Sequence, residues 1–253
     1  MVTGKPVSLG GSLGRQSATG RGVVCAYCEA ARALALRPEA TRVVVQGFGN
    51  VGSWVAQIMT ELGCKLVGVS DVSGAIHCDG GFDPNSLLLH LANGGKLGDY
   101  ADCGANGTER ITPDELLALA YDVLIPAALG DTIDSANADA VCARIVIEGA
   151  NSPTTAAADE ILNDTGVLVV PDVLVDAGGV TVSYFEWAQN LQRLSWDERD
   201  VNDRLEAKMR RAYREVEHRA HPCGVSLRVS AYELGIERVI KAGRLRGHRG
   251  YVQ

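Results

Sequence analysis

Three glycines and an aspartate within thirty residues give the strongest chemical signal in this sequence. The glycine pattern G-x-G-x-x-G is made by Gly47, Phe48, Gly49, Asn50, Val51 and Gly52. Gly47 permits a tight turn, Gly49 lets the backbone approach a pyrophosphate, and Gly52 lets a helix pack closely on its strand. Unpaired amides at the start of that helix would point at the phosphates. The pattern predicts a dinucleotide site.

Asp71 lies nineteen positions after Gly52 and is followed by Val72. At that distance an acidic side chain accepts hydrogen bonds from both ribose hydroxyls of the adenosine half. A 2′-phosphate would meet a carboxylate with no arginine beside it. The predicted cofactor is therefore NAD, with NADP as the weaker alternative.

The elements around these residues support the same interpretation. A β-branched run from Arg42 to Gln46 precedes the glycines, a helical pattern covers 53–62, and a second apolar run covers 65–71. Glycines recur in many turns, so the motif alone is weak. A strand before it, a helix after it and the acid at this spacing make a nucleotide-binding βαβ unit.

Further apolar runs of four to six residues alternate with helical patterns, which indicates a parallel sheet covered on both faces. The predicted fold class is α/β: a Rossmann-like, doubly wound, mainly parallel sheet followed by a helical C-terminal segment. Additional strands are expected at 75–78, 122–126, 144–148 and 167–170. Helices are expected at 18–37, 84–93, 113–120, 136–141, 153–163, 177–191, 197–218 and 230–245.

We predict one dinucleotide-binding domain over residues 1–253, with an opening loop (1–17), a Rossmann core (18–172) and C-terminal helices (173–253). In such a sheet the ligand binds at the carboxyl ends of the strands. The loops there are 47–51, 71–73, 127–129, 149–151 and 171–172. Asn151, in one of them, has an alternative role as the cap of the next helix.

Composition narrows the class of protein. A net charge of −7 argues against binding to nucleic acid or to an anionic membrane, and the basic cluster 244–249 is interpreted as a solvated tail. No run approaches the ~18 apolar residues of a membrane span, and the N-terminus has no apolar signal core. We therefore expect a cytoplasmic protein. Cys25 and Cys28 form a CxxC without a second pair, so two thiols on one helix face are expected and no metal site.

Several ordered motifs resemble the cofactor-domain signatures of glutamate dehydrogenase, in a family that includes leucine, phenylalanine and valine dehydrogenases. They lie at 4–6, 10–15, 18–22, 46–52, 125–128, 148–151, 153–155 and 177–187. The resemblance implies that Thr19 and Asn50 contact the nucleotide and that Ala127, Ala128 and Asn151 line the nicotinamide riboside. It also implies that Ser183 holds the side-chain carboxylate of glutamate, where relatives specific for apolar amino acids have an apolar residue.

Two departures from the family pattern qualify this resemblance. Asp176 stands where the family commonly has asparagine near the nicotinamide, so an amide that donates becomes a carboxylate that cannot. The family's N-terminal domain, with its catalytic lysine and aspartate, has no counterpart here, and no catalytic residue is assigned. The implied reaction is oxidative deamination of L-glutamate to 2-oxoglutarate and ammonia. The alternative is an NAD-binding module without turnover. Because the family forms hexamers largely through the domain without counterpart, a monomer or weak dimer is expected.

Overall fold

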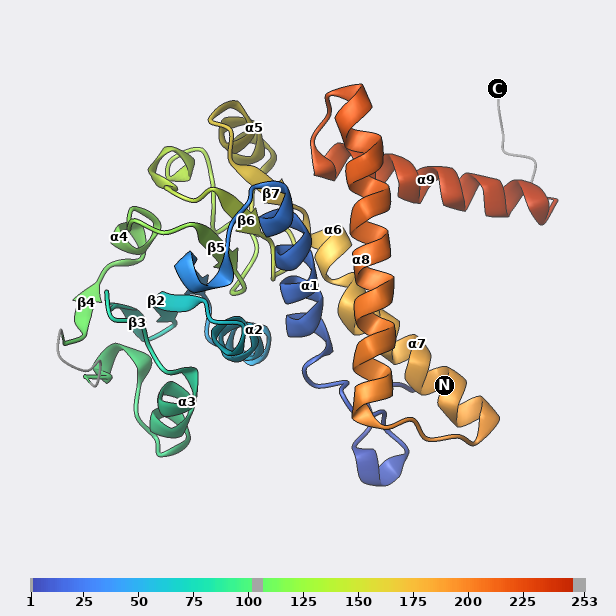
Figure 1. Cartoon of the computed structure of the whole chain (residues 1–253), viewed down its shortest axis with the longest axis horizontal. Coiled ribbons are helices and arrows are strands. Elements are labelled where there is room, and N and C mark those ends of the chain that lie inside the picture. Colours follow the sequence, from blue (N-terminus) through green and yellow to red (C-terminus); the bar gives the residue numbers. More distant parts are fainter. Residues whose placement is uncertain (1, 102–106, 248–253) are drawn as a thin grey trace.

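The computed structural model describes residues 2–101 and 107–247 and has one seven-stranded sheet (Figure 1). The strand order is β4-β3-β2-β1-β5-β6-β7. β1, β2, β5, β6 and β7 are parallel, while β3 and β4 are antiparallel additions at one edge. The strands are β1 (Arg42–Gln46), β2 (Lys65–Asp71), β3 (Gly74–His77), β4 (Glu109–Ile111), β5 (Val123–Pro126), β6 (Ile145–Ile147) and β7 (Leu168–Val170). The predicted fold class is confirmed.

Alternating side chains of the strands build two separate cores, because successive residues of a strand point to opposite faces. Val43 and Val45 of β1 pack on one face with α1 (Ala18–Ala33), α2 (Asn50–Glu61) and α3 (Pro84–Ala92). Val44 packs on the other face, with α4 (Pro113–Leu117) and α5 (Ala156–Asp164). The sheet is therefore doubly wound. The chain adds strands to one side of β1 as far as β4 and then continues on the other side with β5, so the strand order reverses between β1 and β5.

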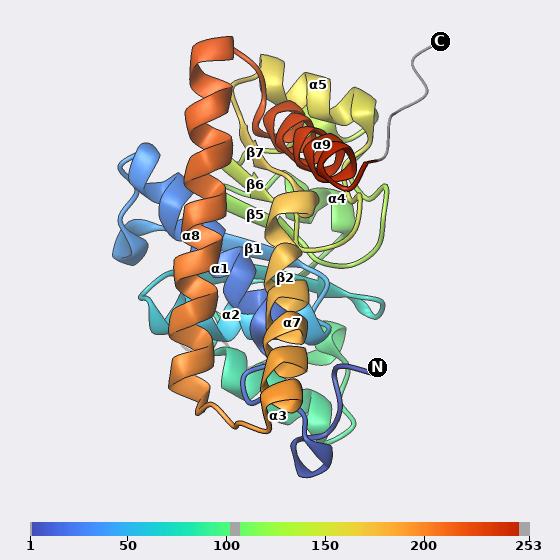
Figure 2. The ribbon, with the colours of Figure 1, turned by 90° about the vertical axis from the view of Figure 1, so that its right-hand side faces the viewer.

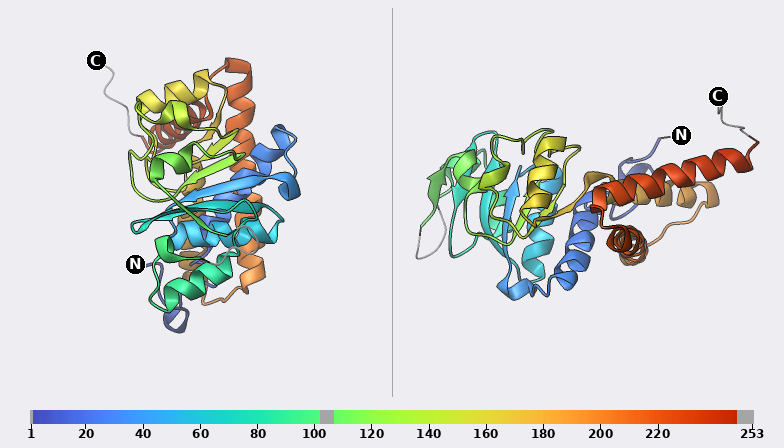
Figure 3. Two further views of the ribbon diagram at one scale, coloured as in Figure 1. Left: turned by 90° about the vertical axis from the view of Figure 1, so that its left-hand side faces the viewer. Right: turned by 90° about the horizontal axis from the view of Figure 1, so that it is seen from above.

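The C-terminal segment is helical, as predicted. It comprises α6 (Asp172–Val175), α7 (Ala177–Gln192), α8 (Glu198–Cys223) and α9 (Leu227–Leu245). α7 and α8 run side by side along α1 (Figure 2). α9 extends away from the sheet (Figure 3, right). The domain division predicted from the sequence stays a prediction, and residues 248–253 of the basic tail lie outside the described residues.

Local structure differs from the predictions in several places. The predicted helices 18–37 and 113–120 end earlier, at Ala33 and Leu117, and the helix predicted from 153 begins at Ala156. Three further differences concern whole elements. The helix expected at 136–141 is only a 3-10 turn at Ala138–Ala140, since the Asp134 and Asn137 side chains bond nearby backbone instead. β4 was missed because it is short, polar and at the sheet edge. The four-residue helix α6 was missed as well. None of the three alters the fold class.

The CxxC cysteines lie on helix α1, as predicted, but they are half-buried rather than buried. Burial raises the pKa of the Cys25 thiol to about 12, with a further contribution from Glu206. No group of three or more metal-ligating side chains occurs among the described residues. Within those same residues, no helix is long and apolar enough to cross a bilayer. The cytoplasmic location stays a prediction.

Candidate functional site

The glycine turn between β1 and α2 has the geometry that its sequence predicts. Gly47 has φ +100°, and a Cβ placed there would lie 2.7 Å from the backbone of Ala128. A Cβ on Gly52 would lie 1.9 Å from the carbonyl oxygen of Gly47. A larger residue at either position would thus collide with backbone. The Phe48 side chain is buried in the core beneath the turn.

The start of α2 leaves room for a ligand. A Cβ built on Gly49 would meet nothing within 4 Å, so the turn is open on that side. No side chain caps α2, so the first amides of the helix have no side-chain acceptor. Gly49 and Asn50 are exposed there. An open cradle with unpaired amides at the start of a twelve-residue helix suits a pyrophosphate.

Asp71 ends β2 on the same edge of the sheet. Its Oδ1 accepts hydrogen bonds from the backbone nitrogen of Ser73 at 2.7 Å and from the Ser73 hydroxyl at 2.6 Å. Among the described residues no arginine or lysine pairs with this carboxylate, and Oδ2 has no protein donor. Oδ2 is free to accept from a diol. Val72, next in sequence, is fully exposed.

A cavity of about 500 Å³ lies beside this turn, at the carboxyl ends of β5 and β6 and along α7. Seven of the residues predicted to bind cofactor or substrate line it together: Thr19, Val51, Ala127, Ala128, Asn151, Asp176 and Ser183. The remaining lining residues are Arg15, Gly149, Ala150, Gly179 and Val180. The other predicted residues, Gly47, Phe48, Gly49, Asn50, Gly52, Asp71 and Val72, do not line this cavity. The structure thus separates the open glycine turn from an adjoining cavity.

Arg15 is the charged residue of the cavity that the sequence analysis did not single out. Its Nε donates a hydrogen bond to the Ser183 hydroxyl at 3.0 Å. No carboxylate lies within salt-bridge distance of Arg15 among the residues described here. The pair therefore presents a guanidinium and a hydroxyl with no protein anion. Arg15 ends the motif 10–15, so the sequence did contain a signal for it.

Close contact between α1 and α7 holds Thr19 at the cavity. A Cβ on Gly178 would lie 2.6 Å from the carbonyl oxygen of Ala18. A Cβ on Gly179 would lie 2.7 Å from the Thr19 hydroxyl. The two adjacent glycines of α7 thus let the helices touch, and Gly179 also lines the cavity.

Asp176 is half-buried in the cavity wall, at the junction of α6 and α7. Burial, followed by the charges of Asp172 and Glu148, raises the pKa of its carboxyl to about 6. A carboxyl of this pKa is ionised at neutral pH and takes up a proton in mild acid. Unlike an asparagine, it brings a titratable charge to the cavity.

Asn151 does not cap α5, so the alternative role predicted for it was wrong. The cap is Thr155, whose side chain accepts from the backbone nitrogen of Ala158. Asn151 is exposed and lines the cavity. The next residue, Ser152, has φ 45°, and its backbone nitrogen donates to Asp172 Oδ2 at 2.7 Å. This bond fixes the loop that carries Asn151.

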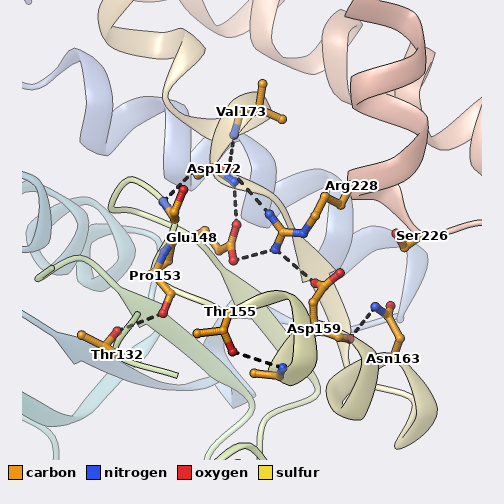
Figure 4. Close-up of polar contacts among 12 residues, drawn as sticks. Thr132, Glu148, Pro153, Thr155, Asp159, Asn163, Asp172, Val173, Ser226 and Arg228 are labelled. Carbon is orange, nitrogen blue, oxygen red and sulfur yellow. Dashed lines mark hydrogen bonds and ion pairs between the residues drawn. The ribbon is translucent and has the colours of Figure 1, made fainter. Parts of the chain in front are cut away.

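A closed cluster of charges lies next to this loop (Figure 4). Arg228 of α9 contacts Glu148 at 2.7 Å, Asp159 at 3.1 Å and Asp172 at 3.7 Å. The backbone nitrogen of Asp172 also donates to Glu148 Oε2 at 2.8 Å. The Glu148 side chain is completely buried. The cluster ties α9, β6, α5 and α6 together at the point where the cavity loop begins.

A larger cavity of about 940 Å³ lies between α8 and α9. Five arginines line it, but each pairs with a glutamate among the described residues, for example Arg219 with Glu237 at 2.6 Å. With its arginines paired, this space offers an anionic ligand no free guanidinium among the described residues. We place the functional site at the smaller cavity.

Comparisons with known proteins relate this chain to one family. Residues 10–247 match the model of the Glutamate/Leucine/Phenylalanine/Valine dehydrogenase family. The chain is 49% identical to a glutamate dehydrogenase of Thermotoga maritima over 98% of its own length. It is 43% identical to an NAD-specific glutamate dehydrogenase of Staphylococcus aureus over 97%. In both cases the chain spans 58% of the relative's length.

Solved structures show the same architecture. A hetero-hexameric glutamate dehydrogenase from Thermus thermophilus, in a leucine-bound form, has a TM-score of 0.89 and 36% identity. A glutamate dehydrogenase from Peptoniphilus asaccharolyticus has a TM-score of 0.82 and 34% identity. Each match covers 97% of this chain and 57% of the solved chain. By the extent of the match and the motifs that line the cavity, the chain belongs to the Glutamate/Leucine/Phenylalanine/Valine dehydrogenase family.

Proposed function

We propose that this chain is the NAD-binding part of a dehydrogenase that oxidatively deaminates L-glutamate to 2-oxoglutarate and ammonia. The observation that carries the proposal is the open glycine turn beside a cavity that contains an unpaired arginine and a serine. The first feature suits a dinucleotide and the second an anionic substrate.

The cofactor would lie across the point where the strand order reverses, between β1 and β5. The amides of α2 would hold the pyrophosphate, and Asp71 would accept from the adenosine ribose. A carboxylate without a cation partner at that position supports NAD over NADP. When bound, the cofactor would supply hydride acceptance; Ala127, Ala128 and Asn151 would line its nicotinamide half.

The substrate proposal rests on Arg15 and Ser183. A dicarboxylic amino acid needs donors for its second carboxylate, because burying that charge without partners is costly. The Nε of Arg15 donates to Ser183 Oγ, which leaves the guanidinium amino groups and the serine proton for an anion. A leucine or phenylalanine side chain has no acceptor for the Arg15 guanidinium and the Ser183 hydroxyl, and would leave both donors without a hydrogen bond. Glutamate is therefore the favoured substrate.

One observation supports the alternative, an NAD-binding module without turnover. The described residues that line the cavity include no lysine and no histidine. The groups that could move a proton there are those of Asp176, Ser183 and Thr19. Turnover would then require proton-transfer groups other than the lysines and histidines that this lining lacks, or groups brought to the cavity from elsewhere.

Calorimetric titration with NAD⁺ and NADP⁺ tests the cofactor proposal. We expect NAD⁺ to bind at least about tenfold more tightly than NADP⁺, since a bidentate ribose contact and the repulsion of a phosphate act in the same direction. D71N is the informative variant, and D114N, an exposed aspartate on the opposite face of the sheet, is its control. Tighter binding of NADP⁺, or no loss of discrimination in D71N, would refute the role of Asp71.

An absorbance assay at 340 nm with glutamate, leucine and phenylalanine then separates the enzyme from the module. Turnover of glutamate supports the dehydrogenase, and NAD⁺ binding with no turnover supports the module. Light scattering on the same sample tests the predicted assembly. We expect a monomer or weak dimer, and a mass six times that of the chain would contradict it.

A further inference from the structure

The cavity carries opposite charges at its two ends. Asp176, Gly179, Val180 and Ser183 follow one another at helical spacing on one face of α7. Asp176 lies at the start of the helix, and Ser183, with Arg15, lies seven residues further on. At 1.5 Å per residue these groups are about 10 Å apart along the axis. The Asp176 carboxylate and the Arg15 guanidinium that bonds Ser183 therefore face different parts of a bound ligand.

The acidic end belongs to the cofactor side of the cavity. Asp71 and β2 lie on one side of the glycine turn, while β5 and β6 lie on the other. If the adenosine ribose meets Asp71 and the pyrophosphate meets α2, the nicotinamide half must pass toward β5 and β6. The loops there, with Ala128 and Asn151, line the cavity. Asp176 belongs beside them, because the charges of Glu148, which precedes the Asn151 loop, and of Asp172, which holds that loop through Ser152, act on it. This step rests on the proposed function.

Asp176 has no cation partner in the part of the chain that the structure describes. The charged groups around it are Asp172 of α6 and Glu148 at the end of β6, and both are held by Arg228 of α9. Arg15 hydrogen-bonds Ser183, its Nη1 lies beside Gly179, and it makes no ion pair with Asp176. The elements that pack against Asp176 thus offer it negative neighbours and no direct counter-ion.

The two redox forms of a nicotinamide differ by one charge in the ring. The oxidised ring is a pyridinium cation and the reduced ring is neutral, while the phosphates, riboses and adenine are the same in both. A carboxylate near the ring attracts the cation and gains nothing from the neutral form. An amide at this position would be almost indifferent to the difference.

We propose that the ionised carboxylate of Asp176 makes this site prefer the oxidised over the reduced nicotinamide dinucleotide. The preference is set by the residue at position 176 and is independent of the contacts to the pyrophosphate and the adenosine. It favours the deamination direction at the level of cofactor binding. In mild acid the carboxyl is neutral and the preference is lost.

The direction of the pH effect follows from linkage. The pKa of free Asp176 is raised to about 6 by burial and by Asp172 and Glu148. Binding of the cationic ring favours the ionised form and lowers this pKa, so affinity for the oxidised cofactor increases as the pH rises through 6. If binding lowers the pKa by about one unit, the ratio of the two dissociation constants, reduced over oxidised, rises about threefold between pH 5.5 and pH 8.

The test measures dissociation constants of NAD⁺ and NADH by calorimetry from about pH 5.5 to about pH 8, in the wild type, D176N and D114N. In the ratio of the two dissociation constants, the pH effects of groups that contact only the phosphates, riboses or adenine cancel, because these parts are the same in both cofactors. We expect the ratio to rise about threefold in the wild type and D114N. In D176N we expect a ratio that is flat within twofold and lower than the wild-type ratio at pH 8.

The outcomes separate this inference from the proposed function. If neither cofactor binds, the proposed function fails and the inference fails with it. If both bind with a pH-independent ratio in the wild type, or with the same pH dependence in D176N, the role of Asp176 is refuted while the cofactor site stands. Should D176N not fold, as judged by its circular dichroism, the wild-type series alone decides. If NADP⁺ proves to be the cofactor, the NADP⁺ and NADPH pair replaces NAD⁺ and NADH.

Discussion

Two neighbouring sets of charged residues in this protein differ in how their charges are paired. Around Arg228, three carboxylates and one guanidinium contact each other, and Glu148 is completely buried. In the cavity, Arg15 and Asp176 carry opposite charges but form no ion pair with each other. The three carboxylates of the first set share one guanidinium and keep a formal negative charge, whereas the charges of the second set face open space. Charges that satisfy one another hold structure, and charges kept apart are available to a ligand.

Asp172 lies on the boundary between the two sets. It contacts Arg228 on one side and accepts from the Ser152 backbone on the other. It also contributes to the raised pKa of Asp176. The closed cluster therefore acts on the open cavity in two ways, by fixing the loop of Asn151 and by placing negative charge behind Asp176.

The largest expected effect comes from opening the closed cluster. R228M removes the cation and leaves buried carboxylates unpaired, which should lower the free energy of unfolding by about 3–5 kcal/mol in urea denaturation. R219M is the control, because its ion pairs with Glu233 and Glu237 are more exposed, and solvent screening should leave them a much smaller contribution. Equal losses in the two variants would show that the Arg228 cluster is not special.

A second effect should appear in ligand binding and leave stability nearly unchanged. R15M removes the unpaired cation, and we expect the affinity for 2-oxoglutarate, measured with NADH bound, to fall about tenfold or more. The unfolding free energy should change by less than about 1 kcal/mol, since no protein carboxylate loses a partner. S183A should weaken the same binding to a smaller degree. A strongly destabilised R15M with unchanged 2-oxoglutarate binding would assign Arg15 to the structural set.

A smaller effect concerns stability against pH. Because the pKa of Asp176 is raised from 3.8 to about 6 by burial and by Asp172 and Glu148, folding favours its protonated form. The contribution is fully present below the ordinary pKa and is lost as the pH rises through about 6. Allowing for partial exposure, the wild type should lose about 1–2 kcal/mol relative to D176N between pH 4 and pH 7. Urea denaturation at several pH values measures this, and a difference that grows with pH in the wild type's favour would contradict the assignment.

The smallest expected effect is a difference in stability between a variant in the cavity loop and a variant at the cap of the helix that follows it. N151A should change the unfolding free energy by less than about 0.5 kcal/mol, because Asn151 is exposed and caps nothing. T155A removes the actual cap of α5 and should cost about 1 kcal/mol. Thermal unfolding of the pair compares them directly. The reverse order would restore the capping role to Asn151.

Local sequence patterns determined a large part of this protein. The strand, glycine turn and helix from Arg42 to Glu61 were predictable because burial periodicity and glycine spacing act over a few residues. Thr155 could have been identified as the cap of α5 from its position, yet Pro153 suggested an earlier start. The polar edge strand β4 gave no clear pattern, because pairing with a distant strand decided it. The helical pattern at 136–141 was misleading, because side-chain hydrogen bonds to the backbone decided that segment.

The pairing of charges was decided only by tertiary structure. Arg15 and Ser183 are 168 positions apart, and Arg228 and Glu148 are 80 apart, so no spacing in the sequence could predict that they meet. The sequence showed that an aspartate occupies position 176, but its raised pKa depends on burial and on Asp172 and Glu148 as neighbours in space. Propensity and periodicity are local, whereas desolvation and Coulomb interactions depend on which distant residues the fold brings within a few ångströms.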